Sequence, residues 1–185
     1  PMKPTTLLWC AAVVAACASV PSPSLESEAR LVQAKSLLAS DPHQALAITD
    51  ELLKQAPRWR DARLCAADGS QRLAASAKDS RRPMLLQEAV ANLEVVVADA
   101  PPRDVPEVWR DLAQCRFDLG SFEAAADAAR TALEGFAARG TAASRRDAAA
   151  VVLLAARADL RVMAERRQAE LQTLAPDRRG YVVPK

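Results

Sequence analysis

The segment from Pro106 to Arg139, PEVWRDLAQCRFDLGSFEAAADAARTALEGFAAR, decides the fold of this chain. Apolar residues recur every three or four positions on both sides of Leu-Gly-Ser at 119–121, which predicts two amphipathic helices. Gly120 suits the left-handed residue that closes the first helix. Ser121 is expected to accept from the backbone amides that open the second helix. The segment therefore predicts a helical hairpin.

Small residues on both predicted helices allow their backbones to approach closely. Ala113 lies on the first helix, and Ala125 and Ala132 lie on the second. We expect the bulky residues Trp109 and Phe122 to touch each other and to fill the space beside the close contact between the two helices. The alternative interpretation is an ordinary helical hairpin inside an unrelated bundle.

The hairpin resembles a tetratricopeptide repeat, a helix–turn–helix unit of 34 residues. The resemblance depends on Trp109, Leu112, Ala113, Gly120, Phe122, Ala125, Ala132 and Leu133. Two positions depart from the family pattern, because Arg116 replaces an aromatic residue and Ala137 replaces the closing proline. The resemblance implies an all-α chain that forms a short right-handed α-solenoid of about three repeats.

Other parts of the chain repeat one feature of this hairpin, an alanine followed twelve positions later by a proline. The pairs are Ala45–Pro57, Ala89–Pro101 and Ala164–Pro176, and in the hairpin above the pair becomes Ala125 and Ala137. Periodicity predicts further helices over 25–39, 44–56, 58–78 and 84–98. Gly69 lies within one of them, which indicates a close packing contact or a kink.

Helix starts are predicted from short-range spacing. Asp104 and Glu107 stand three apart, and so do Ser144 and Asp147, as a capping box requires. After Ser144, residues that favour the helical conformation continue without interruption to Leu174. Apolar residues that hold one phase there favour a single long or bent helix that caps the open end of the repeats: Leu153, Ala156, Leu160, Met163, Leu171 and Leu174. The alternative is a fourth repeat with its turn near Asp159.

The N-terminus has the pattern of a secretory signal sequence. Lys3 precedes an apolar run of about ten residues, which is too short to span a bilayer. Val14-Ala-Ala-Cys17 resembles the lipobox of bacterial lipoproteins, a family in which the cysteine receives diacylglycerol and the peptide is cut before it. This resemblance implies lipidation at Cys17 and an outer-membrane protein that faces the periplasm. The alternatives are a cut at a small-x-small site, which would release a soluble periplasmic protein, or an unmodified Cys17.

These patterns divide the chain into four parts. Residues 1–16 are the expected signal peptide, and 17–24 are the lipidated cysteine with a Ser/Pro tether. Residues 25–176 form the repeat domain, and 177–185 form a tail.

Composition gives little support for catalysis or for cofactors. The net charge of +2 does not favour nucleic acid as a partner. His43 is the only histidine, so we expect no metal site, and we expect it at the surface. Cys65 and Cys115 are expected to be buried apolar residues, with an inter-repeat disulfide as the alternative. We predict neither an enzyme nor a small-molecule substrate.

The remaining function class that we expect is the binding of a protein or peptide. The tetratricopeptide resemblance implies a concave wall made by the first helix of each repeat. The residues that it places there are Glu107, Arg110, Gln114, Phe117 and Asp118 in one unit, with Asp68, Gln71 and Arg72 in the preceding unit. The expected function is a lipid-anchored envelope scaffold that binds other proteins. The alternative is a soluble periplasmic module whose repeats mediate self-association.

Overall fold

The computed structural model describes residues 23–78 and 80–174. Every regular element in these ranges is helical: α1 (Leu25–Leu37), α2 (Pro42–Gln55), α3 (Arg60–Ser76), α4 (Arg81–Ala98), the short 3₁₀ helix η2 (Pro102–Asp104), α5 (Pro106–Asp118), α6 (Phe122–Arg139) and α7 (Ala142–Leu174). The predicted signal sequence, Cys17 and the tail 177–185 lie outside the described residues.

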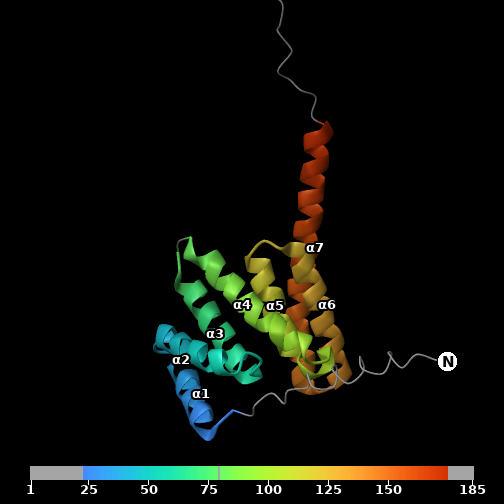
Figure 1. Cartoon of the computed structure of the whole chain (residues 1–185). Helices are drawn as coiled ribbons and strands as arrows, with labels where there is room; N and C mark the ends of the chain where they lie inside the picture. Colours follow the sequence, from blue (N-terminus) through green and yellow to red (C-terminus); the bar gives the residue numbers. More distant parts are fainter. Residues whose placement is uncertain (1–22, 79, 175–185) are drawn as a thin grey trace, which may run out of the picture.

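The helices pack in the order in which they occur along the chain (Figure 1). Each long helix contacts the next, α1 also contacts α3, and α5 also contacts α7. This arrangement confirms an all-α chain in which sequential helices are spatial neighbours.

Alanines on the second helix of each hairpin hold the hairpins together. They lie at the positions that the twelve-residue spacing between alanine and proline predicted. Ala45, Ala89 and Ala125 lie on α2, α4 and α6, and all three are fully buried. Ala164 is exposed and lies within the uninterrupted α7, so its spacing to Pro176 does not mark a fourth hairpin. The prediction of one long C-terminal helix is confirmed.

The turn between α5 and α6 is closed by backbone hydrogen bonds. Gly120 has φ +80°, and its N–H donates to the carbonyl of Phe117 at 3.0 Å. The N–H of Ser121 donates to the carbonyl of Arg116 at 2.9 Å. These two bonds form the Schellman motif, which satisfies carbonyls at the end of α5. The role predicted for Gly120 is confirmed.

Gly120→Ala is expected to lower the free energy of unfolding by about 1 kcal/mol, because the left-handed conformation is unfavourable for a residue with a Cβ. No neighbouring atom would contact that Cβ within the described residues, so the loss is one of backbone strain. Urea denaturation measures it. Gly120→Asn is the matched variant and should lose less, since asparagine tolerates this conformation better. An equal loss in both variants would contradict the backbone explanation.

Three of the predicted side-chain caps are wrong. Among the residues described, the Ser121 side chain accepts no hydrogen bond at the start of α6. Val105 precedes α5, with Pro106 as its first residue, so Asp104 is not the cap. α7 begins earlier than expected, because Thr141 Oγ1 accepts from the N–H of Ser144 at 3.0 Å.

Arg139 engages the second member of the predicted capping box. Its guanidinium lies at the end of α6 and contacts the Glu107 carboxylate. It also donates to the backbone carbonyl of Arg103 at 3.0 Å and to the backbone carbonyl of Asp104 at 2.8 Å. A residue distant in the sequence therefore binds Glu107, which the local spacing assigned to a cap.

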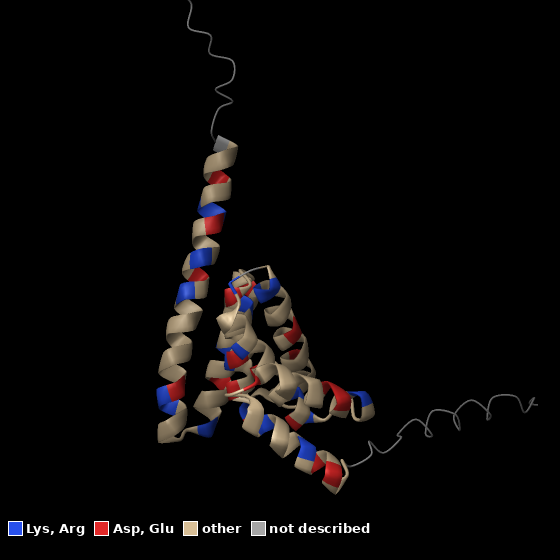
Figure 2. Ribbon diagram, turned by 90° about the vertical axis from the view of Figure 1, so that its left-hand side faces the viewer, with Lys and Arg blue, Asp and Glu red and all other residues tan. Residues whose placement is uncertain are grey.

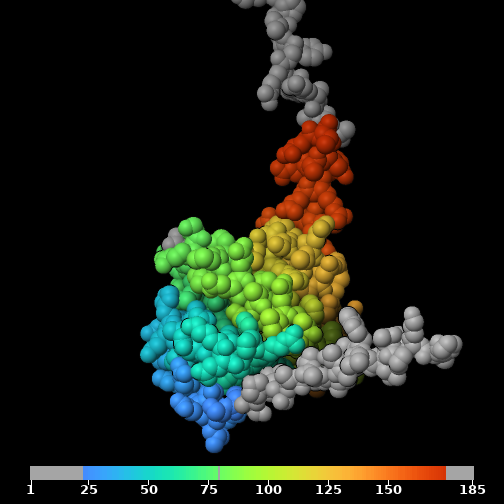
Figure 3. All heavy atoms as spheres, in the orientation of Figure 1, coloured from blue at the N-terminus to red at the C-terminus, as the bar shows by residue number. Residues whose placement is uncertain are grey.

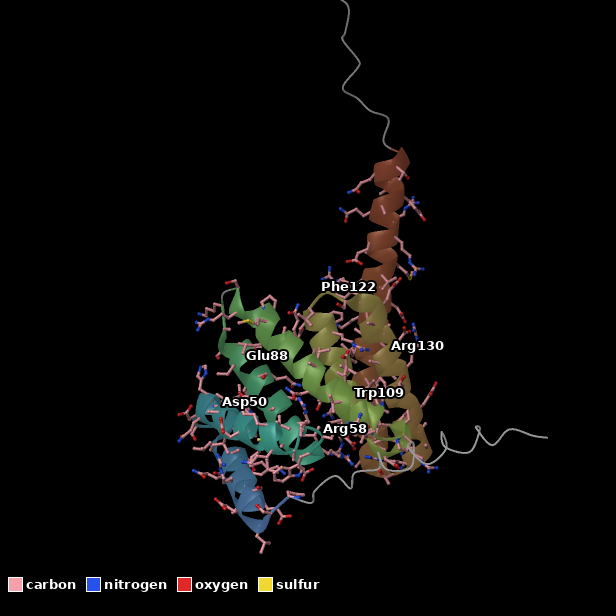
Figure 4. All side chains as sticks on the ribbon, viewed as in Figure 1. Asp50, Arg58, Glu88, Trp109, Phe122 and Arg130 are labelled. Atoms are coloured by element: carbon pink, nitrogen blue, oxygen red, sulfur yellow. The ribbon has the colours of Figure 1, made fainter. Side chains whose placement is uncertain are left out.

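The expected contact between Trp109 and Phe122 is also wrong. Figure 4 shows the two residues at opposite ends of the α5/α6 hairpin. In an antiparallel hairpin, a residue near the start of the first helix faces the end of the second. Phe122 instead packs edge-on against Phe117, with the ring centroids 5.3 Å apart.

Candidate protein-binding face

The residues predicted for the groove lie on α3 and α5. α4 separates these two helices along the chain, but groups on the two helices influence each other. Gln71 on α3 lies close enough to the Cys115 thiol on α5 to lower its pKa, against the burial that raises it. Asp68 on α3 lies close enough to Asp111 on α5 to act on its charge. We call the exposed and half-buried polar residues of α3 and α5 the α3/α5 face.

Several predicted residues of this face are paired along their own helix. Asp68 accepts from Arg72 at 2.8 Å, and Asp118 accepts from Gln114 at 3.1 Å. Arg110 instead donates to its neighbour Asp111 at 2.9 Å. Surface pairs of this kind contribute little to stability and exchange readily with other partners. They therefore leave polar groups that another chain can bind.

Glu107 and Phe117 are less available than the sequence predicts. Glu107 is occupied by Arg139, as described above. Phe117 is covered by Phe122 on one side and by the guanidinium of Arg157, which lies 4.9 Å from the ring centroid. That stacking is a cation–π contact between α5 and α7. Phe117 consequently links three helices.

Asp111 is a member of the face that sequence reasoning missed. Burial raises the pKa of its carboxyl group, and the nearby carboxylates of Asp68 and Glu107 raise it further, whereas Arg110 lowers it. A carboxylate held at a cost in stability is a mark of functional sites.

Asp111→Asn is expected to stabilise the protein at pH 7. Because the pKa of Asp111 is raised in the folded state, the unfolded chain releases this proton at a lower pH than the folded protein does. The ionised carboxylate therefore lowers the free energy of unfolding once the pH exceeds the pKa of Asp111 in the unfolded chain. The gain should disappear below about pH 3.9, where the carboxyl group is protonated in both states. Urea midpoints at the two pH values measure this. Asp118→Asn, at an exposed site on the same helix, is the control, and a similar gain there would contradict the burial argument.

Cys65 and Cys115 are both buried and free. They belong to separate hydrophobic clusters, Cys65 with residues of α1 and α2 and Cys115 with residues of α3 to α7. Burial raises the pKa of Cys65 to about 11 and that of Cys115 to about 12. Such thiols are inert at neutral pH. The two residues therefore act as small apolar core residues, and the disulfide alternative is not adopted.

The described part of the chain contains no group of three or more His, Cys, Asp or Glu side chains that could hold a metal ion. His43 is exposed on the first turn of α2. Within the same ranges, no helix has the length and apolar character needed to cross a membrane.

No protein-family model matches the chain, and no curated protein matches it significantly. Any functional assignment therefore depends on the residues and geometry described above.

Proposed function

We propose that this protein is a tetratricopeptide-like, lipid-anchored scaffold of the bacterial envelope that binds other proteins through the α3/α5 face. One observation carries the proposal. Asp68 and Asp111 belong to two different hairpins, yet Asp68 lies close enough to raise the pKa of Asp111, although α4 lies between them in the chain.

The face suits an extended peptide or a helix from a partner protein. It combines carboxylates, the Arg72 and Arg110 guanidinium groups and the exposed Gln114 amide. Mixed donors and acceptors of this kind bind both backbone and charged side chains.

Site-specific photo-crosslinking in cells tests the binding face. A photo-reactive amino acid at Gln71 or Gln114 is expected to capture the same partner from both positions. The control is Gln87, which is exposed as Gln114 is but lies on α4. Equal capture from Gln87 would mean that the α3/α5 face is not the binding surface.

Charge reversal provides an independent test. Arg110→Glu is expected to reduce the capture, since it changes the sign of a central group without disturbing a core contact. Phe117 is unsuitable for this purpose because its replacement would also remove packing between α5, α6 and α7. Undiminished capture by Arg110→Glu would contradict the proposed face.

Lipid attachment is tested separately at Cys17. The wild-type chain should incorporate labelled palmitate in bacteria, and Cys17→Ser should not. Processing should also be sensitive to globomycin, which inhibits the lipoprotein signal peptidase. A wild-type chain that incorporates no palmitate, or processing that globomycin leaves unchanged, would favour the alternative of a soluble periplasmic module, and labelling that persists in Cys17→Ser would contradict Cys17 as the acylated residue.

A further inference from the structure

Helix α7 is attached to the rest of the molecule in two different ways along its length. As far as Ala158 it is held by buried side chains, since Val151, Leu154, Ala155 and Ala158 are at most 9% exposed and α7 packs against α6. We call residues 142–158 the packed half of α7. Buried apolar contacts of this kind give a helix most of its stability.

The remaining residues, 159–174, form what we call the distal half, and none of their described side chains is buried. Two ion pairs join this half to α6: Asp159 with Arg130 at 2.6 Å, and Arg166 with Glu123 at 2.6 Å. The four side chains are between 46% and 70% exposed. Exposed ion pairs contribute little to stability, and dissolved salt weakens them further.

An open groove lies between the distal half and α6. It has a volume of about 530 Å³, and Ala126, Val162 and Met163 line it together with the residues of the two ion pairs. Val162 is only half-buried, and Met163 is 60% exposed. In a close-packed interface such side chains fill the space and contact the facing helix. Apolar contact therefore holds the distal half weakly.

The last turns of α7 extend beyond the rest of the molecule (Figure 3). Basic and acidic residues follow one another along these turns (Figure 2), and Arg167 pairs with Glu170 at 3.1 Å within the helix. Pairs of this kind support a helix locally but do not attach it to another element. A short helical segment that depends on local interactions alone is marginally stable in water.

The sequence of α7 decides how the distal half can leave α6. Residues 142–174 contain neither glycine nor proline, the usual positions of a sharp kink. The distal half therefore cannot swing away about a hinge and has to unwind from its C-terminal end. Unwinding meets buried side chains at Ala158, so the packed half stays in place as part of a more stable unit.

We propose that the distal half of α7 unwinds as a separate unit, and that its two ion pairs with α6 make this opening sensitive to ionic strength. The opening uncovers Ala126, which is 2% exposed when the groove is closed, together with the α6 surface around it. The accessible surface of α6 thus changes with salt while the hairpins remain folded.

Amide hydrogen exchange of the full chain, followed by mass spectrometry of its peptides, tests the proposal. Rates are compared with an unstructured peptide in the same buffer. Residues 167–174 should exchange within about tenfold of that peptide. Salt raised from about 0.05 M to about 1 M should speed exchange in 159–166 by about 2- to 10-fold and leave 151–158 unchanged. Uniform protection from 151 to 174, or exchange in 159–166 that is indifferent to salt, would overturn the proposal.

Charge removal tests the role of the ion pairs. Glu123→Gln combined with Asp159→Asn should exchange in 159–166 at low salt as fast as the wild type does at high salt, with no further response to salt. Asp127→Asn is the matched control, because Asp127 pairs with Arg130 within α6 and does not hold α7. It should respond to salt as the wild type does. Circular dichroism checks that both variants fold. A double variant with the wild-type salt response, or a control without it, would overturn the assignment to these pairs.

Discussion

Phe136→Ala is expected to lower the free energy of unfolding by about 3–5 kcal/mol. Phe136 lies on α6 and is only 2% exposed, which makes it the largest of the fully buried side chains described. It belongs to the main hydrophobic cluster, which joins α3 to α7. Its removal leaves a cavity between several helices that cannot all move inward at once, so the lost contacts are not replaced.

Chemical denaturation followed by circular dichroism measures this loss. The midpoint denaturant concentration should fall. The slope of the unfolding free energy against denaturant concentration should stay unchanged, because the same amount of surface is exposed on unfolding. Leu153→Ala is the control, since Leu153 is exposed on α7, and it should change stability by less than about 0.5 kcal/mol. A loss below about 1 kcal/mol for Phe136→Ala would show that this cluster does not hold the helices together.

Gly135→Ala is expected to destabilise the protein, although the same change inside an unconstrained helix would stabilise it by about 1 kcal/mol. A Cβ at position 135 would lie 2.5 Å from the carbonyl oxygen of Pro102 and 2.9 Å from Cβ of Pro106. Both contacts are with rigid parts of the structure that lead into α5. The helix must therefore move away from the 3₁₀ segment, and overpacking of this kind typically costs about 1–3 kcal/mol.

Gly69→Ala is the matched control for this substitution. Gly69 was expected to make a close packing contact, and a Cβ there would lie 3.0 Å from the side chain of Leu46. A leucine side chain can change its rotamer, whereas a backbone carbonyl cannot move alone. Gly69→Ala should consequently cost less than Gly135→Ala. Thermal or urea denaturation compares the two, and a more stable Gly135→Ala would contradict the proposed clash.

The tetratricopeptide resemblance proposed part of the candidate site. It placed Asp68, Gln71, Arg72, Arg110 and Gln114 on first helices, and the structure has them on α3 and α5. Asp111 was missed because its carboxylate is influenced by Asp68, which is distant in the sequence. Phe117 and Glu107 were expected to be available for binding, but Arg157 and Arg139 cover them. Both arginines lie far along the chain, so no local pattern identifies these contacts.

The sequence by itself determined the features that depend on neighbouring residues. The helical hairpins follow from apolar periodicity, the α5/α6 turn follows from Gly120, and the close approach of the helices follows from Ala45, Ala89 and Ala125. These are local properties of the backbone and of side-chain volume, so a single chain contains all the information that they need.

Only the tertiary structure decided which groups each side chain meets. Arg139 engaged the Glu107 carboxylate of the predicted capping box, and antiparallel packing separated Trp109 from Phe122. On α7 the predicted apolar residues Leu153, Leu160 and Met163 are exposed, and the face with Val151, Leu154 and Ala158 packs against α6 instead. The physical reason is common to all of these cases: the energy of a contact depends on both partners, and a local pattern shows only one of them.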